Sequence, residues 1–245
     1  MASITALVRD KFSQIVFKEL TVEVVRDVTP HFRRMRVAGD WVRAASCSAG
    51  DKLQIMIADA GMRTYTPFAR NASAGTFELL AFVHGATPGA NWIKRAAPGV
   101  SFRAFGPRGS LPLTTLPGPL VFVGDETSFA AAAALRDARG KSDALAFVFE
   151  TSLLEESETA LADLGIESSA RSQVSLVPKQ SDDAHLPALE AAVRQALTTL
   201  PKAQLVLTGH AQTIQTLRAG LKAHAPAYAG QKTKAYWADG KRGLD

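Results

Sequence analysis

Four apolar stretches in the second half of the 245-residue chain are each followed by a helical pattern. They are LVFVG, ALAFVFE, QVSLVP and AQLVLTG, at residues 120–124, 144–150, 173–178 and 203–209. Apolar strands that alternate with helices are typical of a parallel sheet with helices on both faces. A last strand is expected in TKAYW, at residues 233–237. These patterns predict an α/β domain built on a parallel sheet.

The first half of the chain has a different pattern, in which six short segments mix β-branched and aromatic residues with partial alternation. Gly, Pro, Asn and Asp separate these segments, which lie at residues 16–28, 32–39, 51–59, 62–69, 76–84 and 100–107. Short strands with turns between them predict a small closed antiparallel barrel. The segment SLPLTTLPGPL holds three prolines and a glycine, which is typical of a connection between domains. We therefore expect two domains, at residues 1–117 and 118–245.

Charge is unevenly distributed along the chain, whose formal net charge is +5. Residues 1–118 carry 15 Lys and Arg against 8 Asp and Glu, whereas residues 119–245 carry 13 against 15. A basic first half suits an anionic ligand such as a phosphate-bearing cofactor. Nucleic acid is not expected as the partner, because the basic residues are dispersed and no recognition motif accompanies them.

Composition limits the other classes of function. Hydrophobic and charged residues make up 47% and 21% of the chain, as in globular proteins. No apolar run reaches the roughly 18 to 20 residues of a membrane span, and the first residues lack the apolar stretch of a signal peptide. The single cysteine, Cys47, excludes an internal disulfide, and the five histidines are too scattered to predict a metal site. We expect a cytoplasmic monomer without a bound metal.

The segment RTYT, at residues 63–66, places an arginine and an aromatic ring at alternate positions of a predicted strand. Alternate side chains point to the same face of a strand, so Arg63 and Tyr65 are expected side by side. A flavin needs an aromatic plane beside its ring system, a hydrogen-bond donor near its reacting nitrogen and a cation for its pyrophosphate. Tyr65, Thr66 and Arg63 offer these three groups. The alternative is an exposed Arg–Tyr pair on a barrel surface.

A second segment, FVHGATPGANW at residues 82–92, ends a strand and leads into a predicted helix. Free N–H groups at the start of a helix attract anions, and small residues let a pyrophosphate approach the backbone. Asn91 could cap the helix or contact phosphate, and Trp92 could pack on its apolar side. The alternative is an ordinary Pro-Gly turn next to a strand-end histidine.

The turn in VFVGDETSFA, at residues 121–130, joins a strand to a helix in the way that dinucleotide-binding proteins do. It lacks G-x-G-x-x-G, however, and Asp125 and Glu126 put two carboxylates where a pyrophosphate would lie. Their other role would be to cap the helix and to complement its dipole. NAD(P)H is therefore expected to bind weakly or away from this turn, and a reduced ferredoxin is a second possible donor. Glu150 ends a strand where such folds place a ribose-reading acid, but one acidic residue does not identify NADH.

Taken together, the motifs RTYTP, FVHG with PGANW, APG, GPRGS, GDET and YWADGK resemble those of the siderophore-interacting proteins, from about residue 16 to residue 242. The resemblance implies a ferredoxin reductase-like protein, in which a six-stranded antiparallel flavin-binding barrel precedes a nucleotide-binding domain with a parallel sheet. It implies bound FAD, NADH or NADPH as electron donor, and reduction of siderophore-bound Fe(III) with release of Fe(II). No side chain is expected to act as acid or base.

Carried over by position, the resemblance implies these cofactor-binding residues: Arg63, Thr64, Tyr65, Thr66, His84, Gly85, Gly89, Ala90, Asn91, Trp92, Asp125 and Thr127. It also implies that basic residues bind an anionic ferric siderophore, and the candidates are Arg108, Lys234, Lys241 and Arg242. The chain departs from the family at Phe68, where an arginine is usual, at Asn91, where a serine is common, and at Thr208-Gly209-His210, where the family has AGE. The last change lies beside the expected nicotinamide pocket and leaves the donor open.

Two other functions fit the same residues. One is a general NAD(P)H:flavin reductase, or diaphorase, of the same fold. The other is a non-catalytic protein that binds ferric chelates, although such a carrier has no evident need for paired flavin and phosphate motifs.

Overall fold

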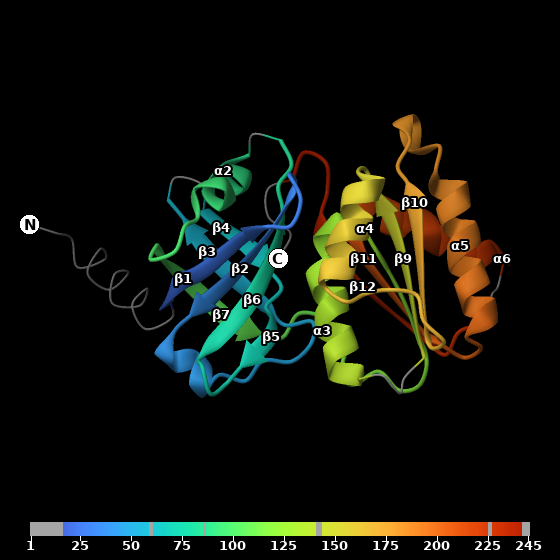
Figure 1. Cartoon of the computed structure of the whole chain (residues 1–245). Helices are drawn as coiled ribbons and strands as arrows, with labels where there is room; N and C mark the ends of the chain where they lie inside the picture. The colour runs from blue at the N-terminus through green and yellow to red at the C-terminus, as the bar shows by residue number, and fades with distance from the viewer. Residues whose placement is uncertain (1–16, 59–60, 86, 141–143, 225–226, 242–245) are drawn as a thin grey trace, which may run out of the picture.

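The structure, a computed structural model of the chain, describes residues 17–58, 61–85, 87–140, 144–224 and 227–241. Two sheets lie next to each other, one antiparallel with seven strands and one parallel with five (Figure 1). The predicted architecture, an antiparallel barrel followed by an α/β unit with a parallel sheet, is therefore confirmed.

The antiparallel sheet closes into a barrel through one short stretch of chain. Its strands are β1 (Lys18–Asp27), β2 (Phe32–Ala38), β3 (Lys52–Ile57), β4 (Gly61–Tyr65), β5 (Phe68–Asn71), β6 (Thr76–Phe82) and β7 (Ser101–Arg108). They lie in the order β4-β3-β7-β1-β2-β6-β5, so β4 and β5 form the two edges. These edges follow each other in sequence, and β4 also contacts β6. Thr66 and Pro67 thus join the two edges of the sheet.

The barrel has seven strands rather than the six predicted, because residues 62–69 belong to two strands. β4 pairs with β3, whereas β5 pairs with β6. Pro67, between them, has no N–H to donate to a strand partner, and Ala69 has a φ of 45°. The alternation of side chains continues through this break, so the pattern alone predicted a single strand.

Apolar side chains of the strands and of two helical segments fill the barrel. The helix α2 (Pro88–Arg95) and the short 3-10 helix η1 (Asp40–Arg43) pack on this core through Ile93 and Val42, which are both buried. Phe77 and Met35 are fully buried at its centre. Arg33 in β2 donates to the carbonyl oxygens of Ile93 and Lys94, at the C-terminal end of α2. These contacts fix the helix, and therefore its N-terminus, against the barrel.

The parallel sheet has the order β10-β9-β8-β11-β12, which places the first strand of the domain at the centre. Its strands are β8 (Leu120–Gly124), β9 (Leu145–Thr151), β10 (Ser172–Pro178), β11 (Gln204–His210) and β12 (Gly230–Trp237). The helical segments are η2 (Glu126–Ser128), α3 (Phe129–Arg139), α4 (Leu154–Asp163), η3 (Ser181–Asp183), α5 (Leu186–Thr199) and α6 (Ala211–His224). Helices α3 and α4 cover one face and α5 and α6 cover the other (Figure 1). All residues of β8 and β9 are buried, as their continuous apolar sequences predict.

The two halves share an apolar core and are joined by ion pairs. The ring of Phe32 in β2 stacks on that of Phe129 in α3, with centroids 5.4 Å apart. Buried leucines of the connection, such as Leu113, belong to the same cluster. On the surface, the guanidinium of Arg34 lies 2.9 Å from the carboxylate of Asp163 in α4. The connection between the domains is therefore packed against both of them.

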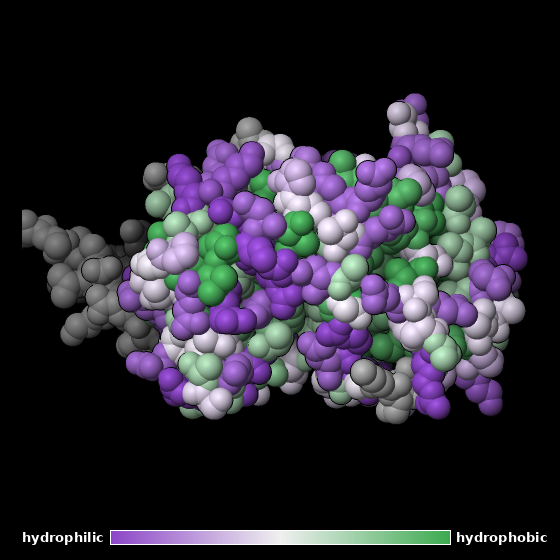
Figure 2. Space-filling view, viewed as in Figure 1, coloured by the Kyte–Doolittle hydropathy of each residue, from purple (hydrophilic) through white to green (hydrophobic). Residues whose placement is uncertain are grey.

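The surface drawn in Figure 2 carries hydrophobic residues in small groups among hydrophilic ones. Within the described ranges, no helix has the length and apolar character needed to cross a membrane.

Candidate functional site

β4 presents the arginine and the tyrosine of the RTYT motif on one face. In the register of β3 and β4, Tyr65 lies opposite Leu53 and Arg63 lies opposite Ile55, both of which are core residues. Thr64 is exposed, on the other face. Tyr65 is half-buried against the barrel core, and this burial raises the pKa of its hydroxyl to about 12. The phenol is therefore neutral at physiological pH and retains its proton for hydrogen bonding.

The side chain of Arg63 lies against the start of α2. A Cβ atom built on Gly89 would lie 3.6 Å from Cγ and Nε of Arg63. The guanidinium also donates to the carbonyl oxygen of Met62, at 2.9 Å. The fold thus brings the two segments singled out in the sequence, RTYT and PGANW, into contact.

In the first turn of α2, one amide has no acceptor among the residues that the structure describes. Thr87 caps the helix, and its hydroxyl oxygen accepts from the amide of Ala90 at 3.2 Å. The amide of Asn91 donates to the carbonyl oxygen of Thr87, and Pro88 has no N–H. The amide of Gly89 is left with no acceptor among the described residues. A positive helix end with a free amide, next to a guanidinium, is a suitable site for a phosphate group.

The remaining residues of this segment have different environments. Asn91 is exposed within the helix, and Thr87 rather than Asn91 is the capping residue. Trp92 packs edge-to-face on Phe102, with centroids 5.1 Å apart, so its predicted packing on the apolar side is confirmed. His84 is exposed, and Gly85 has a φ of +61° with open space where a Cβ atom would lie. The positive φ of Gly85 is a backbone conformation that favours glycine.

Asp125, at the carboxyl end of β8, is fully buried and is held by the chain itself. One of its oxygens accepts from the amide and the hydroxyl of Thr127, and the other accepts from the indole Nε1–H of Trp237 at 2.6 Å. A Cβ atom on Gly209, whose φ is +94°, would lie 2.7 Å from this carboxylate. Asp125 caps η2, as the alternative interpretation of the sequence predicted. Its predicted contact with a cofactor, like that of Thr127, stays a prediction.

Two more carboxylates lie buried near the same edge. Glu126 accepts from the amide of Ser152 at 2.5 Å, and Lys179 lies 3.5 Å from it. Glu150 accepts from His185 at 2.7 Å and from Thr213 at 3.0 Å. Since Glu150 is 2% exposed and already bonded, its carboxylate is not available to read a ribose.

Lys179 is the cation that faces these acids. Burial alone would lower the pKa of its ammonium, but the carboxylates of Glu126, Asp125 and Glu150 outweigh it and raise the pKa. The ammonium also lies 5.4 Å from the centroid of the Trp237 ring. The edge is therefore rich in carboxylates, as Asp125 and Glu126 in the sequence of this turn led us to expect.

The last strand places two aromatic residues at the boundary between the domains. The ring of Trp237 stacks on that of His210, with centroids 4.0 Å apart and planes inclined by 17°. Tyr236 shares a hydrogen bond with Thr66 of the flavin motif, and burial raises the pKa of its hydroxyl. β12 thus links the parallel sheet to the RTYT segment.

Sequence reasoning placed none of Lys179, Tyr236 and Trp237 among the site residues, and noted His210 only as a departure from the family beside the expected nicotinamide pocket. All four lie at or next to the end of a parallel strand. The carboxyl ends of such strands form the usual ligand crevice in doubly wound sheets. Strand-end position was therefore the signal that could have found them.

The predicted substrate residues lie on different elements, and their role stays a prediction. Arg108 ends β7 in the barrel, where it donates to Gln54 and lies over the ring of Phe105. Lys234 is half-buried in β12, and Lys241 is exposed after it. Arg242 lies outside the described residues.

Solved structures of siderophore proteins have the same fold. The siderophore-interacting protein of Acinetobacter baumannii has a TM-score of 0.71 at 15% identity, with 92% of each chain covered. A siderophore utilization protein of T. fusca has a TM-score of 0.72 at 21% identity, with 94% of this chain and 95% of that chain covered. The resemblance inferred from the motifs is therefore confirmed at the level of the fold.

The likeness extends to other flavoproteins. The flavohemoglobin of Malassezia yamatoensis, solved with bound FAD and heme, has a TM-score of 0.67 at 14% identity, over 95% of this chain and 64% of that chain. Ferredoxin reductases also match. No protein-family model and no curated protein sequence matches the chain. What these comparisons establish is a ferredoxin reductase-like fold.

Proposed function

We propose that the chain is an FAD-dependent ferric-siderophore reductase, which uses NAD(P)H or a reduced ferredoxin as electron donor. Bound FAD would supply the redox chemistry, because a flavin can take up electrons singly or as a pair and can release them one at a time to Fe(III). The electron acceptor would be Fe(III) held in a siderophore, released as Fe(II). Similar solved structures of siderophore proteins support this proposal.

The observation that carries the proposal is the contact of Arg63 with Gly89 at the start of α2. It brings together a guanidinium and a helix amide that has no acceptor among the described residues, and these two groups fit a diphosphate. Tyr65, two residues along β4, offers its ring to a planar ligand, and Thr66 offers a hydroxyl. These residues would bind and orient the cofactor. None of them has to move a proton.

The site expected for the electron donor is lined by carboxylates rather than by a cation. A nicotinamide nucleotide in the crevice at the carboxyl ends of the strands would meet the Trp237 ring and the buried carboxylates of Asp125 and Glu126. Anionic phosphates are disfavoured next to like charges. NAD(P)H would therefore bind weakly or only after Trp237 moves, which leaves a one-electron protein donor as the competing possibility.

The deciding experiment is the visible absorption spectrum of the purified protein, before and after addition of FAD. We expect flavin bands that stay with the protein through gel filtration. Anaerobic addition of NADH, NADPH or reduced ferredoxin then identifies the donor by loss of those bands. A ferric siderophore added next should restore them and yield Fe(II), which an Fe(II)-specific chelator traps. A protein that stays colourless in excess FAD would rule the proposal out.

A general flavin reductase is the second candidate, and one observation favours it. The carboxyl edge of the parallel sheet holds the buried carboxylates of Asp125, Glu126 and Glu150, and negative charge there disfavours an anionic siderophore. Steady-state rates with ferric catecholates, ferric hydroxamates and artificial acceptors would separate the two functions. Equal kcat/KM for all acceptors would favour the general reductase.

A further inference from the structure

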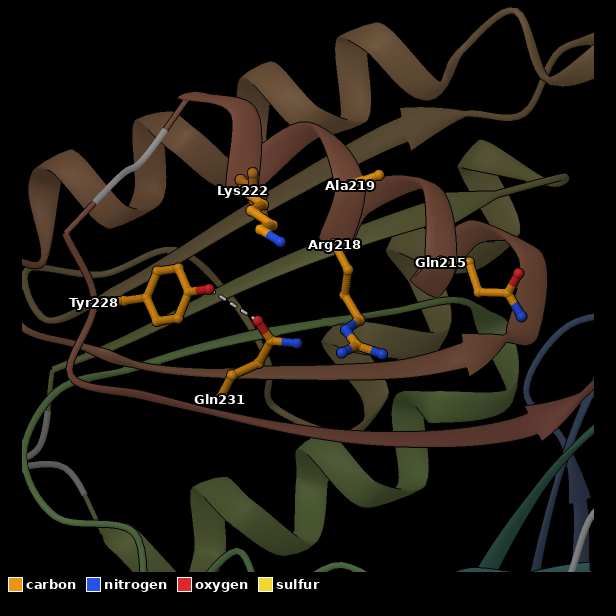
Figure 3. A pocket seen from close by; sticks show the side chains of 7 residues that line it. Gln215, Arg218, Ala219, Lys222, Tyr228 and Gln231 are labelled. Atoms are coloured by element: carbon orange, nitrogen blue, oxygen red, sulfur yellow. Dashed lines mark hydrogen bonds between the residues drawn. The ribbon is translucent and has the colours of Figure 1, made fainter.

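A groove of about 490 Å³ lies between α6 and the edge strand β12, on the side of the parallel sheet that α5 and α6 cover (Figure 3). Arg218 and Lys222, one turn apart on α6, both extend toward β12. Tyr228 and Gln231 face them from the start of β12 and the residues before it. Leu221, which is buried, contributes an apolar wall.

The groove is basic because its lining contains Arg218 and Lys222 and no carboxylate. Glu190, which lies against Gly220 of the same helix, pairs with His224. Residues 191–238 contain six Lys and Arg and no Asp or Glu. Residues 119–190, in contrast, contain five Lys and Arg and 13 Asp and Glu. No ion pair involves Arg218 or Lys222 in the described part of the chain, and no carboxylate lines the groove. Two cations that face one hollow without a counter-ion repel each other unless an anion lies between them.

The polar lining consists mainly of hydrogen-bond donors. The hydroxyl of Tyr228 donates to Oε1 of Gln231 at 3.0 Å, which fixes the carboxamide and directs its NH₂ group away from the tyrosine (Figure 3). The guanidinium offers a planar fork of donors, and the ammonium offers a mobile point charge. A phosphate group has only acceptor oxygens at neutral pH and matches this combination.

The Gln231 end of this groove lies away from the crevice at the carboxyl ends of the strands. Gln231 and Trp237 are six positions apart on β12. At about 3.3 Å per residue, they are separated by roughly 20 Å. The other end of the groove, at Gln215, lies nearer the crevice, because α6 begins at Ala211, directly after His210. A small ligand held at Gln231 therefore does not contact Trp237.

We propose that the groove between α6 and β12 binds a phosphate-bearing small molecule, with Arg218 and Lys222 holding the phosphate and Gln231 donating to it. The Tyr228 ring and Leu221 would contact the less polar part of the ligand. Nothing in this site depends on flavin chemistry, so it stands or falls separately from the reductase function.

Pyrophosphate is the probe, titrated calorimetrically into the full-length protein with FAD in excess. We expect one binding event that weakens by at least about tenfold in the Arg218→Ala/Lys222→Ala variant. The matched control is Lys202→Ala/Lys232→Ala, which removes the same charge from two exposed residues outside the groove. The control should change affinity by less than about twofold. Arg218→Lys keeps the charge but not the planar fork of donors. It should weaken pyrophosphate binding by an amount between the effects of the two double variants.

Two results would overturn the site. One is equal binding of pyrophosphate by the Arg218→Ala/Lys222→Ala variant and the control. The other is loss of binding in Arg63→Ala instead, which would place the probe at the start of α2. A circular dichroism spectrum and a Tm equal to those of the parent chain would show that the variants are folded.

Discussion

The barrel end and the carboxyl edge of the parallel sheet both carry the polar groups of a nucleotide-binding protein, but they use them differently. At the barrel end, Arg63 meets a helix start whose Gly89 amide has no acceptor in the described part of the chain. At the sheet edge, the carboxylates of Asp125, Glu126 and Glu150 are buried and accept hydrogen bonds from the chain itself. The barrel end thus offers hydrogen-bond donors and positive charge that suit an anionic ligand. At the sheet edge, the polar groups are already bonded to other groups of the chain.

The difference shows that a strand–turn–helix junction is not by itself a phosphate site. The junction after β8 has the expected topology, yet its first polar residue is a buried acid that caps the chain and holds Trp237. The junction before α2 belongs to the antiparallel barrel, yet it has small residues, a nearby cation and an amide with no acceptor among the described residues. Charge and unpaired donors, rather than topology, decide which of the two can hold a diphosphate.

The largest expected effect comes from Asp125→Ala. The change removes the cap of η2 and leaves the indole N–H of Trp237 and the groups of Thr127 without an acceptor. We expect the free energy of unfolding to fall by about 3 kcal/mol. Urea unfolding at neutral pH measures it. Asp137→Ala, at a partly exposed acid on α3, is the control and should cost under about 0.5 kcal/mol. An equal decrease in the free energy of unfolding for both variants would mean that the hydrogen bonds of buried Asp125 stabilise the fold no more than a partly exposed acid does.

Arg63→Ala tests the other region. Removal of a charge-assisted hydrogen-bond donor from the phosphate site should raise the Kd for FAD by roughly tenfold to a hundredfold. Quenching of FAD fluorescence on binding measures the Kd. Arg95→Ala removes the same charge from the last turn of α2, away from the N-terminus, and should leave the Kd within about twofold. If both variants bound FAD like the parent chain, the barrel end would not be the phosphate site.

Trp237→Ala tests whether the sheet edge is closed by its own residues. The indole lies against His210, so its removal makes room for a nicotinamide ring. We expect the KM for NAD(P)H to fall about threefold to tenfold, within the range that one buried aromatic contact can supply. Trp237→Phe keeps a ring on His210 and loses only the hydrogen bond to Asp125, so its KM should stay near that of the parent. A KM that is unchanged in Trp237→Ala would show that the aromatic ring does not limit access.

The two regions were also unequally predictable from the sequence. Strands and helices followed from local periodicity, and the candidate anion site, which stays a prediction, was read from residue types within the short segments 63–66 and 84–92. The closure of the barrel at Pro67 was missed, because one alternating pattern runs through both edge strands. The sheet-edge network was missed because its bonds join distant parts of the chain: Asp125 and Trp237 are 112 residues apart. No local pattern records a contact of that kind.

The smallest expected effect concerns the ion pairs that join the two domains. Burial alone would raise the pKa of Asp163, but Arg34 and Arg26 outweigh it and lower that pKa; Thr29 and His31 likewise lower the pKa of Glu156. A carboxylate with a lowered folded-state pKa stabilises the fold above its unfolded pKa of about 4, and this contribution is lost as the pH falls further.

Asp163→Asn should therefore reduce the free energy of unfolding at pH 7 by under about 1 kcal/mol, and the difference from the parent chain should shrink toward pH 3. Urea unfolding at the two pH values measures both quantities. Glu158→Gln removes the same charge from an exposed position of α4 and serves as the control, with little effect at either pH. A difference for Asp163→Asn that stays constant from pH 7 to pH 3 would mean that Asp163 acts through packing rather than charge. The arrangement of barrel and sheet would then depend on the apolar contact of Phe32 with Phe129 and not on these ion pairs.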